Sequence, residues 1–284
     1  MKKKIIIGLI VIIVLVVLGI FVFKSKEIIG GYTKTELTFK NEQDQGIYAM
    51  LYKPNKKGKV PLVIYSHGLG ATYRACGDYA DHLAKEGIAS VCIDFRGGSN
   101  RSKSDGKSTE MSIITEMDDV ETVLKEVKKW EFVDTDNIIL MGSSQGGAVS
   151  ALISAKHEEI KGAVLLYPAT SLPSAIKRWY SNTKDIPEEI PMNSNITVGK
   201  NYFTDVWDLD VYKEIANDEH PIIMIHGTED PLVNPSESDK LHEIYKNSKV
   251  YKIEGAGHGF DDEYFDEAIK YVDEFFKEIG VLKE

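Results

Sequence analysis

Apolar runs of four to eight residues recur along most of this chain, and they constrain its fold more than any other feature of the sequence. They lack the polar alternation of half-buried strands, and helical periodicities separate most of them. Strands of this kind occur in parallel sheets that helices cover on both faces. The runs are Val60–Ser66, Ile88–Asp94, Asn137–Met141, Ile160–Tyr167, Pro221–Ile225 and Val250–Ile253, and the helical stretches are Tyr73–Glu86, Met111–Trp130, Gln145–Lys156, Pro235–Lys246 and Asp262–Ile279.

Two further segments, Thr35–Lys40 and Ile47–Lys53, flank a polar turn and predict an antiparallel pair ahead of the parallel strands. Together the segments predict an α/β fold with a mostly parallel sheet of about eight strands and helices on both faces. One interval breaks this rhythm, because Pro168–His220 is far longer than an ordinary crossover. We expect this segment, about residues 168–220, to form a small inserted cap.

Residues 5–23 form a run of nineteen positions without a polar or charged side chain. As a helix this run measures about 28 Å, close to the roughly 30 Å hydrocarbon core of a bilayer. A cleaved signal peptide usually has a shorter apolar region and a small-residue cleavage site, so we favour an uncleaved signal anchor and keep the signal peptide as the alternative. The lysines at positions 2–4 outweigh those at 24 and 26, which predicts a cytoplasmic N-terminus.

The charge balance separates the N-terminal segment, residues 1–26, from the body, residues 27–284. The segment holds five of the chain's 34 basic side chains and no acidic one, so the body carries 29 basic against 44 acidic groups, a net charge of −15. Phosphate backbones repel such a body, and we exclude nucleic acid as a partner. We predict a single-pass protein of the cell membrane, in which residues 1–26 are a cytoplasmic stub with a lipid-embedded anchor and residues 27–284 are an extracytoplasmic domain.

Cys76 and Cys92, the two cysteines of the chain, fall at a predicted helix start and in a predicted buried strand. They can form at most one disulfide, and we expect both to be inert packing residues. No group of His, Cys, Asp and Glu residues has the spacing of a metal site. We therefore predict neither a metal nor another cofactor.

The pentapeptide Gly142-Ser143-Ser144-Gln145-Gly146 lies between a predicted strand and a predicted helix. A Gly-x-Ser-x-Gly sequence in this context is typical of a nucleophile elbow, whose serine sits on a strained turn. Side chains at the two glycine positions would collide with neighbouring backbone. The sequence therefore predicts Ser144 as a nucleophile.

A second glycine-rich turn, His67-Gly68-Leu69-Gly70, follows the strand predicted over residues 60–66. Glycines let the chain fold over a site so that backbone N–H groups converge on one oxygen. We expect the N–H groups of Leu69 and Gln145 to form such an oxyanion hole. We interpret His67 as structural rather than catalytic.

Asp230 and His258 follow later strands, in the order Ser, Asp, His that this architecture requires. His258 is the predicted base, because it comes directly after the strand at residues 250–253. Asp230 lies a few residues past the strand at 221–225, and we prefer it as the acid to Glu229, Asp261 and Asp262. We assign no catalytic role to the other six histidines, at positions 67, 82, 157, 220, 226 and 242.

Together these motifs resemble those of the α/β-hydrolase superfamily, specifically the bacterial serine esterase branch that includes cinnamoyl (feruloyl) esterases and serine-aminopeptidase-like lipases. The resemblance covers about residues 35–280. It implies that Ser144, Asp230 and His258 form a catalytic triad, that Leu69 and Gln145 donate to the oxyanion, and that the cap shapes the acyl pocket. The shared motifs are His67-Gly68-Leu69-Gly70, Asp94-Phe95-Arg96-Gly97-Gly98, Gly142-Ser143-Ser144-Gln145-Gly146-Gly147, Gly227-Thr228-Glu229-Asp230-Pro231-Leu232-Val233 and Gly257-His258-Gly259-Phe260.

These observations predict a membrane-anchored serine hydrolase that cleaves carboxylic esters through an acyl-enzyme. A small-molecule ester with an aromatic or apolar acyl group is the expected substrate, unless the aromatic residues of the cap merely form its own core. A serine peptidase of the aminopeptidase type, with Glu188 and Glu189 at a peptide amino terminus, and an acyltransferase stay open as alternatives. So does a non-catalytic binding protein with this fold. The aromatic residues of the cap are Trp179, Tyr180, Tyr202, Phe203 and Trp207.

Overall fold

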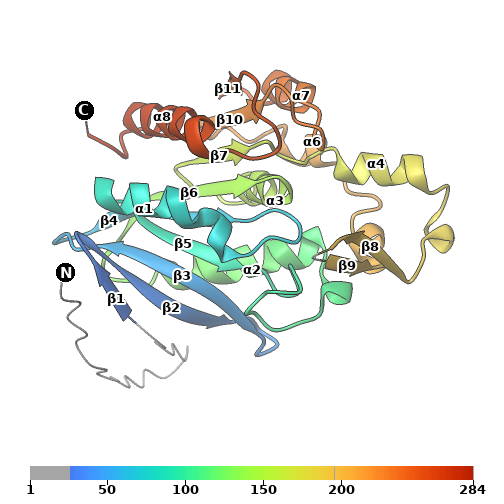
Figure 1. Cartoon of the computed structure of the whole chain (residues 1–284), viewed down its shortest axis with the longest axis horizontal. Helices are drawn as coiled ribbons and strands as arrows, with labels where there is room; N and C mark the ends of the chain where they lie inside the picture. The colour runs from blue at the N-terminus through green and yellow to red at the C-terminus, as the bar shows by residue number, and fades with distance from the viewer. Residues whose placement is uncertain (1–25, 195, 284) are drawn as a thin grey trace.

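A computed structural model of the chain describes residues 26–194 and 196–283. Its large sheet has nine strands in the order β1-β2-β3-β5-β4-β6-β7-β10-β11, and a separate two-stranded hairpin lies beside it (Figure 1). From β5 to β11 neighbouring strands are parallel, whereas β1, β2 and β3 add to the β5 edge in antiparallel pairs. The strands are Lys26–Ile29 (β1), Tyr32–Lys40 (β2), Gly46–Pro54 (β3), Val60–Ser66 (β4), Ala89–Asp94 (β5), Val133–Ser143 (β6), Gly162–Leu166 (β7), Ile222–Gly227 (β10) and Ser248–Ile253 (β11).

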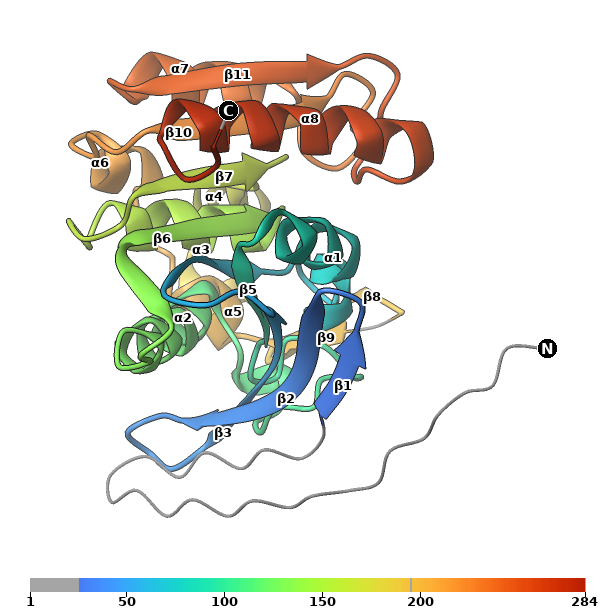
Figure 2. The ribbon, with the colours of Figure 1, turned by 90° about the vertical axis from the view of Figure 1, so that its left-hand side faces the viewer.

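Helices cover both faces of this sheet. One face carries α1 (Gly77–Glu86) and α8 (Asp262–Glu278), and α8 lies along β10 and β11 (Figure 2). The other carries α2 (Ile113–Val127), α3 (Gln145–Ser154) and α7 (Ser236–Ile244). The side chains of β4 divide between them, since Leu62 and Ile64 join the core of α2 and α3 while Val63 and Tyr65 join that of α1 and α8. A strand covered on both faces needs the continuous apolar run seen in the sequence.

The predicted α/β fold with a mostly parallel sheet is confirmed, and each of the six predicted parallel strands and the predicted antiparallel pair is present. The ninth strand of the large sheet is β1, which the sequence pattern does not predict. Its four residues are too few for a periodicity, and its pairing with β2 across the turn at Gly30 and Gly31 makes it a strand. Helix α1 starts later than predicted, because Tyr73–Cys76 forms a 3₁₀ turn (η1) ahead of it.

The segment that we expect to be a cap, about residues 168–220, folds into short helices and the hairpin at one end of the molecule (Figure 1). Its buried side chains continue the core on the α2–α3 face. Tyr202 and Phe203 are buried in that core, whereas Trp179 is 57% exposed, so these three aromatic residues do not form one pocket wall. The elements are α4 (Leu172–Trp179), η3 (Thr183–Asp185), β8 (Glu189–Asn193), β9 (Ile196–Gly199), α5 (Asn201–Thr204) and α6 (Val211–Ile215).

Cys76, at the end of η1, and Cys92, in β5, form a disulfide, so the expectation that both are inert packing residues is wrong. The crossover from β4 to β5 lays the start of α1 against the sheet and brings the two Cα atoms to 5.8 Å, a separation that a disulfide spans. Both residues are buried in the core beneath α1. The bond therefore ties the segment after β4 to the sheet.

The apolar run at residues 5–23, and with it the predicted stub and membrane anchor, lies outside the described residues. Within residues 26–194 and 196–283, no helix combines the length and the apolar character needed to cross a bilayer.

Candidate active site

Ser144 lies at the sharp turn between β6 and α3. Its backbone angles, φ 53° and ψ −120°, fall in a region that residues other than glycine rarely adopt. A Cβ atom on Gly142 would clash with the carbonyl oxygen of Gly146, and one on Gly146 would clash with the carbonyl oxygen of Ser66. Glycine is therefore required on both sides of the strained serine, for the steric reason that the sequence pattern suggests.

Three side chains from three loops meet beside this turn. The Nε2 atom of His258, in the loop after β11, lies 2.9 Å from the Oγ atom of Ser144. The Nδ1 atom of His258 lies 2.7 Å from Oδ2 of Asp230, in the loop after β10. Because β6, β10 and β11 run parallel, their carboxyl ends share one edge of the sheet, and residues far apart in sequence meet there.

The carboxylate of Asp230 is buried and accepts hydrogen bonds on both oxygens. Its Oδ1 accepts from the backbone N–H groups of Leu232 (2.8 Å) and Val233 (2.9 Å), and its Oδ2 faces His258. Burial alone would raise the pKa of Asp230, but the N–H of Val233, the ring of His258 and the N–H of Leu232 together hold the pKa below its ordinary value. Asp230 is therefore ionised, so Nδ1 of neutral His258 carries the proton and Nε2 presents a lone pair to Ser144.

Aromatic rings border His258. Tyr167, which follows β7, meets the His258 ring edge-on with the centroids 4.7 Å apart. Phe260 packs on Tyr167 in the same manner, at 5.2 Å. These rings restrict the positions open to the imidazole and give this side of the site an apolar wall.

The loop His67–Gly70 lies against the serine. A Cβ atom on Gly68 would lie 3.1 Å from Cβ and 3.6 Å from Oγ of Ser144, so glycine lets the loop approach this closely. Leu69 follows Gly68 in this loop, and Gln145 follows Ser144 as the first residue of α3. Neither of their N–H groups donates to another group in the described part of the chain. Two free donors beside a nucleophile are what an oxyanion hole requires.

His67 holds this loop in place. The backbone N–H of Phe95 donates to its Nε2 at 3.2 Å, so Nδ1 carries the proton and donates to the carbonyl oxygen of Gly68 at 2.8 Å. Burial lowers the pKa of His67 to about 4, and the ring is neutral. These contacts fit the structural role expected for this histidine.

Gln145 belongs to a buried hydrogen-bond network that the sequence analysis misses. Its Nε2 donates to Oε2 of Glu116 on α2 at 2.8 Å, and the hydroxyl of Tyr202 on α5 donates to its Oε1. Burial raises the pKa of Glu116 to about 8, so this carboxyl is protonated at neutral pH. The sequence holds one indication of this network, because Glu116 is an acidic residue on the apolar face of a helix, between Ile113 and Val120. The network links the segment 168–220 to the residue beside the serine.

Besides His258, a second histidine contacts Asp230. This residue is His226, to which the sequence analysis assigns no role. It lies near the end of β10, four residues before Asp230, and this spacing was the available signal. The ring is fully buried.

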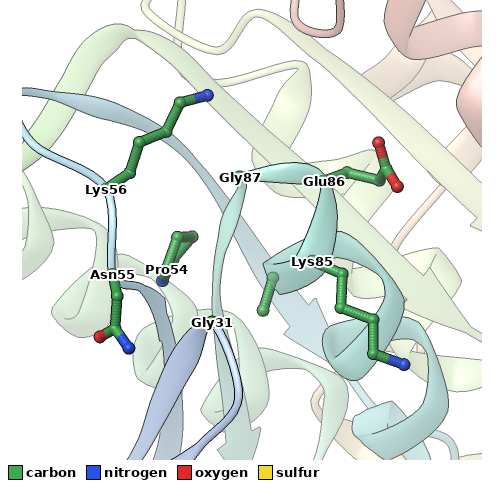
Figure 3. A pocket seen from close by; sticks show the side chains of 8 residues that line it. Gly31, Pro54, Asn55, Lys56, Lys85, Glu86 and Gly87 are labelled. Carbon is green, nitrogen blue, oxygen red and sulfur yellow. The ribbon is translucent and has the colours of Figure 1, made fainter.

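A surface cavity of about 220 Å³ lies elsewhere (Figure 3). It is bordered by the β1–β2 turn, the end of β3 and the end of α1, so it faces the amino ends of β4 and β5 rather than the edge that carries Ser144. Lys56 packs there against Gly87 at the carboxyl end of α1, where a cation is favourable. This cavity has no part in the arrangement around Ser144.

Comparison with known families gives two overlapping matches. Residues 58–219, more than half of the chain, match a family model described as serine aminopeptidase, S33. Residues 184–261 match a model described as alpha/beta hydrolase fold. The first match includes Ser144 and the second includes Asp230 and His258.

Among solved structures, Est1E of Butyrivibrio proteoclasticus with bound ferulic acid has a TM-score of 0.76 and 26% identity, covering 83% of this chain and 96% of that chain. Acetyl xylan esterase 1 of a Thermoanaerobacterium species has a TM-score of 0.66 and 19% identity, covering 90% of this chain and 87% of that chain, and it shows the fold alone.

Among curated proteins, the human acylamino-acid-releasing enzyme is 23% identical over 69% of this chain and 28% of its own length. The quorum-quenching protein AidA of Acinetobacter baumannii is 23% identical over 43% of this chain and 40% of its own length. The matches thus span less than half of either relative. The first family model covers more than half of the chain, and the chain therefore belongs to the serine aminopeptidase S33 family of α/β hydrolases.

Proposed function

We propose that this protein is a serine esterase that hydrolyses small-molecule carboxylic esters with Ser144, His258 and Asp230 as its catalytic triad. The observation that carries the proposal is the continuous chain of contacts from Ser144 Oγ through the His258 ring to Asp230, at 2.9 Å and 2.7 Å. The strained turn under Ser144 supports it, because such a turn exposes the hydroxyl at the edge of the sheet.

The protonation states define the order of events. As the Ser144 oxygen attacks the ester carbonyl, Nε2 of His258 accepts its proton, and Asp230 stabilises the resulting imidazolium. The carbonyl oxygen becomes an oxyanion, which accepts from the N–H groups of Leu69 and Gln145. His258 then returns the proton to the departing alcohol, and an acyl-Ser144 ester remains. Water, activated by His258, opens this ester, releases the acid and restores the hydroxyl. No step requires a cofactor.

An aromatic or apolar acyl group is the substrate class that we favour. Tyr167 and Phe260 supply an apolar border beside His258, and the similar Est1E structure carries ferulic acid. Tyr202 and Phe203 contribute less to this argument than the sequence suggests, because both are buried in the core.

The peptidase alternative gains little support from the acidic pair of the cap. The side chain of Glu188 is 86% exposed and pairs with Lys200, and Glu189 is exposed on β8. Two solvated carboxylates, one of them neutralised, form a poor site for a peptide amino terminus. The ester reaction is therefore the better supported of the two.

A matched substrate panel tests the proposed reaction. The full-length protein in detergent is assayed on p-nitrophenyl esters and on p-nitroanilides with the same acyl groups, with Ser144→Ala as the control. We expect ester cleavage to exceed amide cleavage and to vanish in the variant. Faster amide cleavage would favour the peptidase, and product formation only with an added alcohol would favour the acyltransferase.

We further propose that residues 5–23 anchor the enzyme in the cell membrane with its catalytic domain outside the cytoplasm. The apolar length and the lysines at positions 2–4 support this topology. The buried Cys76–Cys92 disulfide supports it independently, because such bonds persist in oxidising compartments. External protease should digest the domain in intact cells, and complete protection would contradict the topology. A mature N-terminus beyond residue 23 would instead identify a cleaved signal peptide.

A further inference from the structure

His226 is a fully buried residue of β10 whose ring contacts the acid of the proposed triad. Its Nε2 atom lies 3.2 Å from Oδ2 of Asp230 and 3.1 Å from the carbonyl oxygen of Val233. Its Nδ1 atom lies 2.7 Å from the hydroxyl of Ser238, on α7. Oδ2 of Asp230 is the same oxygen that faces Nδ1 of His258.

These contacts fix the protonation of His226. Nε2 faces two acceptors, the ionised Asp230 and a carbonyl oxygen, so Nε2 carries the proton. Burial lowers the pKa of His226 and keeps the ring neutral, which leaves Nδ1 to accept from the Ser238 hydroxyl. Lys252 faces His226 from the adjacent strand β11 and favours the same neutral form, while its own charge pairs with Asp239 of α7.

We propose that His226 is a positioning residue of this esterase, which holds Oδ2 of Asp230 in line with Nδ1 of His258. The inference rests on the proposed function of Ser144, Asp230 and His258. Val233 supports it, because its N–H donates to Oδ1 of Asp230 while its carbonyl oxygen accepts from His226. The turn from Asp230 to Val233 is therefore hydrogen-bonded to His226 of β10 at both of its ends.

The donor from His226 also sets how basic the carboxylate is. Asp230 has four donors in this arrangement, two backbone N–H groups and two imidazole rings. A carboxylate that loses one donor attracts the proton of a facing imidazolium more strongly. Loss of the His226 donor should thus raise the pKa of His258 and move the acid limb of kcat/KM to higher pH.

Two substitutions separate this hydrogen bond from simple packing. His226→Gln places an amide nitrogen near the Nε2 position and keeps the donor, whereas His226→Asn places one near Nδ1 and loses it. For the Asn variant of the full-length protein we expect kcat to fall about 10–100-fold, with the acid limb shifted upward and KM little changed. For the Gln variant we expect kcat within about threefold of the wild type and an unshifted acid limb.

Equal losses in the Gln and Asn variants would overturn the proposal, because they would show that only the shape of the ring matters. An unshifted acid limb in the Asn variant would overturn it as well. If thermal melting shows that the Asn variant is unfolded, Ser238→Ala takes its place, since it removes the hydroxyl that orients the ring. A smaller upward shift of the acid limb supports the proposal there, and no shift overturns it.

An NMR titration separates this proposal from the proposed function. In the Ser144→Ala background, the ring protons of His258 report its pKa without any turnover. A higher pKa after His226→Asn supports the positioning role, and an unchanged pKa overturns it. Absence of ester hydrolysis by the wild-type protein, by contrast, would contradict the proposed function and leave this titration to decide the role of His226.

Discussion

Two buried carboxyl groups lie near Ser144, one linked to it through His258 and the other bonded to the next residue, Gln145, and they hold opposite protonation states. Asp230, in the loop after β10, has four hydrogen-bond donors and a pKa below its ordinary value. Glu116, on α2, has one donor, the side-chain amide of Gln145, and a pKa raised by burial to about 8. Its second oxygen has no partner among the described residues.

The difference shows how local structure decides the charge of a buried acid. Burial penalises the charged form of both groups, and only enough donors offset that penalty. The turn at residues 230–233 supplies free backbone N–H groups to its own aspartate, whereas Glu116 lies in a helix whose N–H groups are already used. The ionised acid, Asp230, thus lies in a loop whose backbone N–H groups are available, and the neutral acid, Glu116, lies in a helix whose N–H groups are not.

The largest effect should follow from removing the charged acid. Asp230→Asn keeps the shape of the side chain but offers an amide donor to Nδ1 of His258, which favours the wrong tautomer. We expect kcat to fall about 10⁴-fold on a chromogenic ester, with the fold intact by circular dichroism. The neighbouring exposed acid provides the control, because Glu229→Gln should retain nearly full activity. Similar losses in both variants would contradict the assignment of Asp230.

The protonation of Glu116 should be measurable in the way the free energy of unfolding depends on pH. Between its ordinary pKa of 4.5 and about 8, Glu116 holds a proton in the folded state that the unfolded chain releases. The free energy of unfolding should therefore fall as pH rises through this window, by about 1.4 kcal/mol for each unit of pKa difference. In Glu116→Gln the side chain cannot titrate, so the variant should lose less free energy of unfolding over this window than the wild type. The difference between the two losses should be on the order of a few kcal/mol.

Urea denaturation at pH 5 and pH 8 measures this difference. Asp119, whose pKa burial raises to about 7, adds a slope of the same sign to both proteins, so the test compares the two profiles rather than reading one alone. Parallel pH profiles for the wild type and Glu116→Gln would mean that Glu116 is ionised, and the contrast with Asp230 would be lost.

A smaller effect should come from Tyr202, the residue by which segment 168–220 joins the hydrogen-bond network of Gln145 and Glu116. Tyr202→Phe removes the donor to Oε1 of Gln145 and leaves that oxygen buried without a partner. We expect a loss of about 1–3 kcal/mol in unfolding free energy and a fall in kcat of a few fold. Tyr180→Phe is the matched control in the same segment, because Tyr180 is only partly buried. Equal stability of the two variants would show that the Tyr202 hydroxyl contributes nothing.

The sequence predicts the fold and the meeting of Ser144, Asp230 and His258 because both follow from local pattern. Apolar runs define the parallel strands, and residues just past their carboxyl ends must gather at one edge. The glycines beside Ser144 follow from sterics within five residues. These features need no knowledge of how distant side chains pack.

What the sequence misses depends on such packing. Gln145 meets Tyr202, 57 positions away, only when segment 168–220 packs on the core of α2 and α3. Cys76 pairs with Cys92 only after α1 lies on β5. His226 follows apolar residues in the sequence, as a residue of a buried strand does. Its contacts with Asp230 and Val233 form only when the turn after β10 folds back over the ring. Periodicity carries no signal for these side-chain contacts.

Labelling with a fluorophosphonate tests the central claim most directly, because such probes react with a serine that a neighbouring histidine activates. The full-length protein in detergent is treated with the probe, digested and mapped by mass spectrometry, with Ser144→Ala as the control. We predict one covalent adduct, on Ser144, which is absent from the variant. A folded wild-type protein that stays unlabelled, or an adduct on a different serine, would contradict the account.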